Sequence, residues 1–246
     1  SDGNGNKNVV YVNFSNNPQG DGTGRTPEAD AKVYTYQLNV QKVGENASPL
    51  ADAEFVLYQR VSGSGNTTSY KYAIFDETAE NGSYVIKNWI TLPTPIGGES
   101  KDLDDYKEGD PNVALDANKT PILIDGKPVT LDNMIVVSPE SGLIEIIGLE
   151  AVDHWLAELN APLPYNVKKE PISVSIKSTH DENSGTITEL TVSADGTLGV
   201  ADKSTGVGTI TVQNNKGNTL PSTGGIGTTI FYVAGGLLVV AAITLL

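Results

Sequence analysis

The sequence predicts an all-β protein, built as a β-sandwich with a surface insertion and followed by a C-terminal transmembrane helix. Short runs of Val, Ile, Thr and Tyr alternate with polar residues, which is the period of a half-buried strand. Turn-forming Gly, Pro, Asn and Asp separate these runs, and helical periodicity is scarce. Many short strands with frequent turn signals are typical of two sheets packed face to face.

Composition excludes several classes of function. Thirty acidic residues against sixteen basic ones give the 246-residue chain a net charge of −14, which repels nucleic acid. Cysteine is absent, so no disulfide supports the fold. Because the chain has no Gly-x-Ser-x-Gly elbow and no phosphate loop, we expect a protein that is not an enzyme and has no cofactor. The acidic run at 102–110 fails the spacing of a calcium loop, and His154 and His180 lack zinc-site spacing, so no metal site is expected.

The first predicted strand covers Asn8–Asn16. No strand precedes it, and a lone strand is unstable in water. A breaker cluster at 17–24 follows, which is typical of a linker. We therefore interpret residues 1–30 as the last strand of an upstream domain plus a connector, within a longer protein. The alternative is that this strand joins the sheet of the next domain. One face of the strand carries Val10, Val12, Phe14 and Asn16.

The second predicted domain covers residues 31–217. Between 91 and 120 the chain is polar and rich in Asp, Gly and Pro, which indicates a surface insertion. Asp125-Gly126 predicts the turn of a hairpin within 121–131. The other strands expected in this domain are Tyr34–Val43, Ala53–Tyr58, Tyr70–Phe75, Tyr84–Ile90, Ile135–Val137, Leu143–Ile147, His154–Glu158, Ile172–Ile176, Ile187–Val192 and Thr209–Gln213.

The last predicted segment, 218–246, joins a short motif to an apolar run. The motif is Leu220-Pro221-Ser222-Thr223-Gly224, and the run Ile226–Leu246 has no charge and is long enough to cross a bilayer. This arrangement resembles the sorting signal of Gram-positive surface proteins, which a sortase cuts after the Thr. The resemblance implies that sortase joins Thr223 to peptidoglycan or to a neighbouring pilin subunit, and that the membrane is a partner only before sorting. The alternative is an ordinary tail anchor. The basic tail of the family is missing, so we expect the sequence to be clipped there.

Three further stretches resemble the Cna B-type domains of Gram-positive pilins and collagen-type adhesins. The first is Lys42-Val43 followed by residues 49–57. The second runs from Gly148–Ala151 through His154–Glu158 to Ala161-Pro162 and Tyr165. The third is Val207–Gly217. The resemblance implies an Ig-like sandwich that holds an internal Lys–Asn isopeptide bond promoted by a Glu. The family pattern is broken at Val152, His154, Leu159 and Pro164, whereas the Glu and Ala-Pro positions hold.

The residues that would form this bond are Lys42 and Asn214, with Glu158 as the catalytic residue. A lysine amine attacks only when neutral, and burial favours the neutral form. A protonated carboxyl in the same pocket can polarise the amide carbonyl and relay the proton that lets ammonia leave. The period of two places all three side chains inward and the rival acceptor, Asn215, outward. The alternative is that each is a solvated residue at a strand end.

The stretch Phe14–Pro18 also resembles the end of the preceding domain in shaft pilins. Asn16 is accordingly a possible isopeptide acceptor for that upstream domain, and the lysine that accepts the next subunit would lie upstream. The sequence thus predicts a structural subunit of a covalently polymerised, wall-anchored pilus that supports adhesion on a Gram-positive surface. One alternative is a non-polymerised, wall-anchored adhesin with this domain as its stalk. Another is a wall-anchored enzyme whose catalytic domain lies upstream. The host ligand cannot be identified from these residues.

Overall fold

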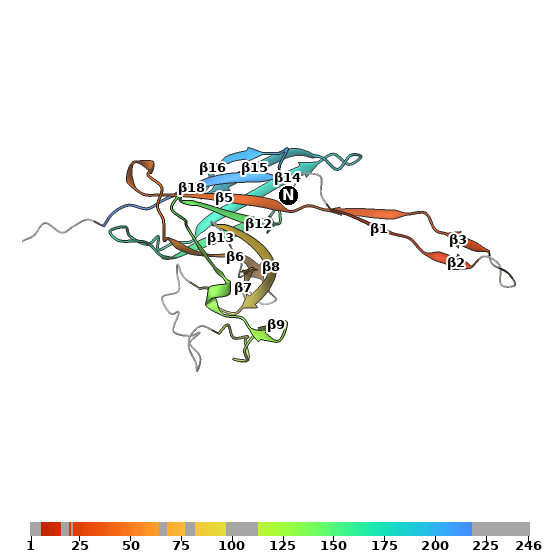
Figure 1. Ribbon diagram of the computed structural model, residues 1–246, viewed down its shortest axis with the longest axis horizontal. Helices are drawn as coiled ribbons and strands as arrows, with labels where there is room; N and C mark the ends of the chain where they lie inside the picture. Colours follow the sequence, from red (N-terminus) through yellow and green to blue (C-terminus); the bar gives the residue numbers. More distant parts are fainter. Residues whose placement is uncertain are drawn as a thin grey trace, which may run out of the picture. The chain divides into compact units, whose positions relative to one another are not determined.

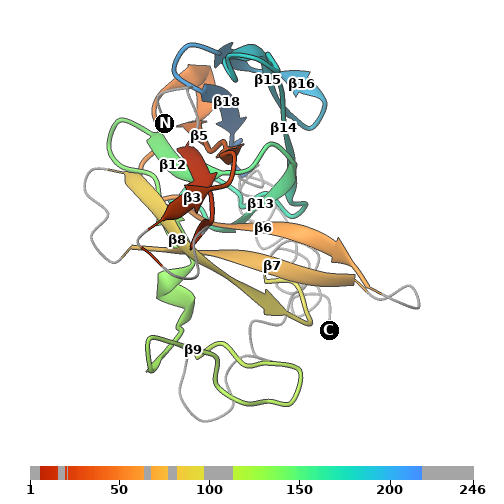
Figure 2. The same cartoon turned by 90° about the vertical axis from the view of Figure 1, so that its right-hand side faces the viewer.

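The computed structural model describes residues 6–15, 20, 22–63, 68–76, 82–96 and 113–217. The chain divides into two compact units, Ser1–Asn215 and Lys216–Leu246. The described part of the first unit is a sandwich of strands (Figures 1 and 2), which confirms the predicted all-β class.

One layer of the sandwich holds both the first and the last strand of the main domain. Its strands, in spatial order, are β17 (Val200–Asp202), β18 (Val207–Gln213), β5 (Tyr36–Val43) and β12 (Leu143–Leu149). Strands β18 and β5 pair in parallel, with Ile210 opposite Val40 and Val212 opposite Lys42. The two ends of the domain are therefore neighbours in one sheet.

The other layer is larger and mostly antiparallel. Its strands, in spatial order, are β16 (Thr197–Leu198), β15 (Ile187–Ala194), β14 (Ile172–His180), β13 (Asp153–Asn160), β6 (Glu54–Ser62), β7 (Thr68–Phe75) and β8 (Ser83–Leu92). The short strand β11 (Ile135–Val137) pairs with β6. Strand β8 links the layers, because its start pairs in parallel with β12 and the remainder pairs with β7.

The main core lies between these layers and follows the predicted alternation. From Tyr36 to Lys42, strand β5 buries every second residue, and Leu38 and Val40 are fully inaccessible to solvent. The residues between them are half-buried. From the larger layer, Phe55, Leu57 and Leu156 pack into the same cluster. Burial of alternate apolar residues fixes the strand register, because a slip of one residue would turn them to solvent.

A second core lies on the opposite face of β6 and β7, and the sequence did not predict it. Tyr58, Tyr72 and Ile90 pack there against Val129 and Met134, which come from the segment after the insertion. The hairpin β9 (Leu123–Ile124) and β10 (Lys127–Pro128) and the 3₁₀ turn η3 (Leu131–Asn133) belong to this segment, visible around β9 in Figure 2. The described ends of the predicted insertion are not simply surface loop, since Ile96 and Ala114 are each only 2% exposed.

The N-terminal segment differs from the prediction of a single strand and a strandless linker. The structure splits it into β1 (Asn6–Val10) and β2 (Asn13–Ser15), which pair with β4 (Ala29–Val33) and β3 (Thr23–Arg25). The result is a two-stranded ribbon, drawn in red in Figure 1. The pairing partner lies after the breaker cluster, where local patterning carried no strand signal.

The hairpin turn agrees with its prediction, whereas the limits of several strands differ from theirs. Asp125 and Gly126 both have positive φ, as the predicted hairpin turn requires, so that hairpin is confirmed. Strand β5 begins at Tyr36 rather than Tyr34, and a 3₁₀ turn, η1 (Glu45–Ala47), follows it. The two-residue and three-residue strands β16 and β17 were missed because they are too short to show a period, and their residues are exposed except for the half-buried Ala201.

Candidate functional site

Lys42 lies near the end of β5 with its side chain inside the sandwich. It continues the inward row of Leu38 and Val40, and like them it is 0% exposed. Its backbone is held on both sides, because its N–H donates to Gly142 O and its carbonyl accepts from Leu50 N–H. A charged side chain is rarely buried this completely without a partner, so its neighbours decide its chemistry.

Asn214 is brought beside Lys42 by the parallel pairing of β18 with β5. Its backbone N–H donates to Val43 O, which extends the ladder one residue past the last strand. The Asn214 side chain is 1% exposed and follows the inward Ile210 and Val212. Asn215 is exposed, as its opposite parity predicts.

Glu158 reaches the same pocket from the other layer. It lies on β13, opposite Phe55 of β6, and is 2% exposed. Its inward direction follows from Leu156, two residues earlier on the same face. Residues from β5 and β13 and the residue directly after β18, all far apart in the sequence, thus meet in one enclosed pocket.

The three side chains contact one another directly. The Lys42 amine donates a hydrogen bond to Asn214 Oδ1 at 2.5 Å and lies 3.2 Å from Glu158 Oε1. The Asn214 amide nitrogen donates to Glu158 Oε1 and Oε2, at 2.8 and 2.9 Å. The carboxyl therefore faces the amide nitrogen, whereas the sequence-based expectation was a carboxyl that polarises the amide carbonyl.

Burial lowers the pKa of the Lys42 amine, which favours the neutral, nucleophilic form. The negative charge of Glu158 and its hydrogen bond act in the opposite direction, and the positive charge of Lys168 again lowers this pKa. The Phe55 ring lies 5.6 Å from the amine and forms part of the apolar wall. The pocket thus combines a desolvated amine, a carboxamide and a carboxyl group at contact distance.

The loop 161–170 covers this pocket, and its role was not predicted. The Lys168 backbone N–H donates to Glu158 Oε2 at 2.6 Å, and the Asn166 N–H donates to Asn215 O at 3.0 Å. The Tyr165 ring lies so close to Gly44 that a side chain there would overlap it. In the sequence, Ala161-Pro162 and Tyr165 of this loop contributed only to the family resemblance. The Lys168 contact left no signal, because any residue except proline offers a backbone N–H.

Two family models match the chain. The first, described as the SpaA prealbumin-like fold domain, matches residues 36–191, from the start of β5 into β15. The chain belongs to this family. The second, the LPXTG cell wall anchor motif, matches residues 212–246 and so includes Leu220–Gly224. The predicted resemblance to a Gram-positive pilin domain before a sorting signal is confirmed, and the SpaA-family chain is a cell-wall-anchored surface protein. The matched domain belongs to a family of structural, non-enzymatic domains, as expected for residues 36–191.

Solved structures of Gram-positive pilins share limited likeness with this SpaA-family chain. A minor pilin of Streptococcus agalactiae is 19% identical with a TM-score of 0.34, over 76% of this chain and 48% of that one. The pilus 2b backbone protein of group B streptococcus is 17% identical with a TM-score of 0.40, over 81% and 50%. The major pilin subunit of Bacillus cereus is 15% identical with a TM-score of 0.35, over 88% and 40%. The chain spans about half the length, or less, of these proteins. No curated protein matches it.

Several predicted site residues of the SpaA-family chain lie outside the described residues. These are Asn16, the sorting motif Leu220–Gly224 with its cleavage point after Thr223, and the apolar run Ile226–Leu246. Among the described residues, no helix combines the length and apolar character that a membrane crossing needs.

The described residues of this SpaA-family domain contain no cluster of three or more His, Asp or Glu side chains that could hold a metal ion. The acidic run 102–110 lies outside the described part. His154 is fully buried, its Nε2 donates a hydrogen bond to the Glu150 carbonyl oxygen at 3.1 Å, and its ring stacks on Trp89. His180 contacts Tyr34 and Tyr36 at the other end of the domain's larger layer. Both histidines therefore take part in the packing of the domain.

Proposed function

We propose that the chain is a structural subunit of a covalently polymerised, cell-wall-anchored pilus that supports adhesion, and that its main domain is crosslinked by an isopeptide bond between Lys42 and Asn214. The observation that carries the proposal is the enclosed contact of Lys42, Asn214 and Glu158. A buried lysine, asparagine and glutamate in contact are costly to retain in a sandwich core for packing alone.

The proposed reaction balances without a cofactor. The neutral Lys42 amine attacks Asn214 Cγ, a new C–N bond forms, and the bond from Cγ to the amide nitrogen breaks. One proton passes from the attacking nitrogen to the leaving nitrogen, which departs as ammonia. Glu158 is placed to carry that proton, because its Oε1 lies 3.2 Å from the amine and 2.8 Å from the amide nitrogen.

The position of the bond suits a protein that bears tension. Force that enters at the start of β5 would run along that strand to Lys42, cross the bond to Asn214, and continue toward Thr223. Strands β5 and β18 are parallel neighbours, so this path uses only the two ends of the domain. The segment between the two bonded residues, which are 172 positions apart, would carry little of the load.

The bond is tested by the intact mass of the purified chain. We expect a mass lower than that of the sequence by one ammonia, and a crosslinked peptide that joins Lys42 to Asn214. Glu158→Ala is expected to restore the full mass. An unmodified mass in the folded wild-type chain, or a crosslink at Asn215, would overturn the assignment.

Assembly through Thr223 is tested on the cell wall. Sortase is expected to cleave after Thr223 and join it to peptidoglycan or to a lysine of the neighbouring subunit, which gives a ladder of high-mass polymers on denaturing gels. Thr223→Ala is expected to remove that ladder and to release the protein from the wall. Wall-bound protein that ends at Thr223 without any ladder would instead identify a non-polymerised adhesin.

We further propose that residues 1–30 belong with an upstream domain, that 31–217 form the crosslinked domain, and that 218–246 are the sorting and transmembrane segment. The ribbon supports the first boundary, because its large apolar side chains are open to solvent. Val10, Val12 and Phe14, which the alternation of the sequence assigns to one face, are 65%, 59% and 47% exposed. In the longer protein, the rest of an upstream sandwich would cover this face, with Asn16 as its isopeptide acceptor.

A further inference from the structure

The carboxyl group of Glu158 is fixed by a group that belongs to none of the three reacting side chains. Its Oε1 faces the Lys42 amine and the Asn214 amide, whereas its Oε2 accepts from the Asn214 amide and from the Lys168 backbone N–H at 2.6 Å. Two donors on each oxygen define the rotation of the carboxyl plane. That rotation decides whether Oε1 can bridge the attacking and the leaving nitrogen.

We infer that Lys168 is a positioning residue for the Lys42–Asn214 bond, because its backbone N–H orients the carboxyl group of Glu158. This inference rests on the bond proposed above. Lys168 does not touch the reacting atoms of Lys42 or Asn214, so its effect passes through Glu158 and through its charge.

The loop that carries Lys168 is held over the pocket at several points. The Asn166 N–H donates to the backbone of Asn215, directly after the acceptor residue. The Tyr165 N–H donates to Pro162 O, which closes a turn at the start of the loop, and the Tyr165 ring packs on Gly44. These contacts fix the Lys168 N–H where Glu158 needs it.

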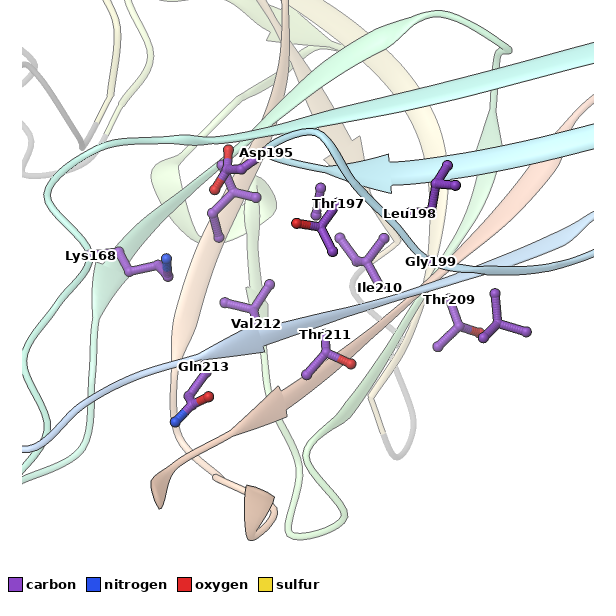
Figure 3. Close-up of a pocket in the computed structure, with 13 residues that line it drawn as sticks. Lys168, Asp195, Thr197, Leu198, Gly199, Thr209, Ile210, Thr211, Val212 and Gln213 are labelled. Atoms are coloured by element: carbon purple, nitrogen blue, oxygen red, sulfur yellow. The ribbon is translucent and has the colours of Figure 1, made fainter. Parts of the chain in front are cut away.

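The Lys168 side chain provides the second contribution. It is half-buried and borders the groove beside β18, where Figure 3 shows it across from Val212 and Gln213. Among the described residues, the charged groups that act on Lys42 are Glu158 from β13 and Lys168 from this loop. Burial is the largest cause that lowers the Lys42 pKa, Glu158 opposes it, and Lys168 lowers it further. The ammonium of Lys168 thus offsets part of the effect of Glu158 and favours the attacking form of Lys42.

The test measures how fast the bond forms. Full-length chains that are isolated from inclusion bodies in denaturant with their full mass are refolded by dilution over a series of pH values. The loss of ammonia is followed by intact mass, and folding is followed by circular dichroism. Four variants separate the two contributions: Lys168→Met removes the charge and keeps the N–H, Lys168→Arg keeps both, Lys168→Pro removes both, and Lys169→Met is the matched control on the neighbouring lysine.

We expect the pH at which Lys168→Met loses ammonia at half its maximal rate to be higher than in wild type. Lys168→Arg and Lys169→Met should keep the wild-type dependence of the rate on pH. Lys168→Pro should react about tenfold more slowly than Lys168→Met even at the high-pH plateau, because a hydrogen bond to the carboxyl is lost. Val167→Pro, which leaves the Lys168 N–H in place, controls for proline in the loop. A merely structural role would lower folding and rate together without moving the pH profile.

The outcomes distinguish this inference from the proposal on which it rests. If the folded wild-type chain never loses ammonia, the bond itself is wrong. If wild type loses ammonia and the folded Lys168→Met and Lys168→Pro variants match its rate and profile, only the role of Lys168 is overturned.

Discussion

The Lys42 amine lies 2.5 Å from the Asn214 side-chain oxygen, although the two residues are 172 positions apart in the sequence. A covalent bond at this point closes nearly the whole domain into one loop. Crosslinking a loop of this length restricts the unfolded chain far more than the folded one, and a chain-entropy estimate gives about 5 kcal/mol of stabilisation.

The first prediction follows from that loop. Glu158→Gln keeps the shape of the side chain but cannot carry the proton, so the chain is expected to retain its full mass. Its free energy of unfolding should fall by about 5 kcal/mol, measured by chemical denaturation. Glu189→Gln, at an exposed carboxylate on β15, is the matched control and should leave mass and stability unchanged. A linked Glu158→Gln chain would contradict the prediction.

The second prediction concerns the pH dependence of an unlinked chain. Asn214→Ala leaves Lys42 as a free buried amine whose pKa is lowered, chiefly by burial, from an ordinary value of 10.5. The unfolded state then binds the proton more readily than the folded state, so the free energy of unfolding rises with pH up to about 10.5. It falls as pH decreases through the folded-state pKa.

The linked wild-type chain has an amide at Lys42, which does not titrate, so this part of the slope should be absent. Denaturation curves of wild type and Asn214→Ala between neutral and alkaline pH provide the measurement. The double variant Asn214→Ala with Lys42→Met should lose the extra slope. Equal slopes in wild type and Asn214→Ala would show that Lys42 is free in both.

The placement of the three candidate residues could be predicted because it depends on local alternation. Lys42 follows Leu38 and Val40, and Asn214 follows Ile210 and Val212, so parity alone separates inward from outward positions. The same reasoning placed Asn215 outside. A period of two is a property of the backbone, and it holds wherever one face of a strand is buried.

Other features could not be predicted because they depend on pairing between distant segments. Strand β8 changes partner from β12 to β7 along its length, and no local pattern encodes that change. The second core requires Val129 and Met134 to return over β6 and β7. The Lys168 contact with Glu158 uses a backbone N–H, which any residue except proline offers.

The third prediction concerns acid stability and His154. Burial is the main cause that lowers the His154 pKa from its ordinary value of 6.5, so the folded state favours the neutral ring. Below about 6.5 the unfolded state takes up the proton first, and stability is lost as pH falls through the folded-state pKa. The slope for one such group approaches about 1.4 kcal/mol per pH unit.

His154→Gln is expected to be less stable than wild type at neutral pH, because it loses the stacking on Trp89. Its free energy of unfolding should, however, depend less on pH than that of wild type between pH 6.5 and about 4.5, which is about two units below the ordinary pKa. Thermal unfolding across this range provides the measurement. His180→Gln is the comparison, since His180 is half-exposed and also has a pKa lowered by desolvation. If the free energy of unfolding of His154→Gln changed with pH as steeply as that of wild type, the acid sensitivity would come from another group.

The fourth prediction uses the close approach of Gly44 to Tyr165. A Cβ at residue 44 would overlap the Tyr165 ring, although the backbone of Gly44, with φ −94°, suits any residue. Gly44→Ala is therefore expected to destabilise by about 1–3 kcal/mol through overpacking rather than backbone strain. The double variant with Tyr165→Ala should recover part of that loss. No recovery in the double variant would mean that another contact limits residue 44.

The fifth prediction concerns the N-terminal ribbon. Strand β1 pairs only with β4 among the described residues, with Asn6 opposite Val33 and Val10 opposite Ala29. Val10 is 65% exposed, whereas Val40 in β5 is 0% exposed. A ribbon of two strands with an open apolar face is marginally stable in water, because it buries little surface.

Amide hydrogen exchange of the chain should accordingly find Val10 and Val12 orders of magnitude less protected than Val40. Restoring the upstream sequence should raise the protection of Val10 and Val12 and leave that of Val40 unchanged, because the proposed upstream domain covers the face that Val10 shares with Phe14. Val10→Ser in the longer protein should then lower the stability of the upstream domain, while the same substitution in this chain has little effect. Protection at Val10 equal to that at Val40 in this chain would show that the ribbon is stable by itself and would remove the support for the upstream assignment of residues 1–30.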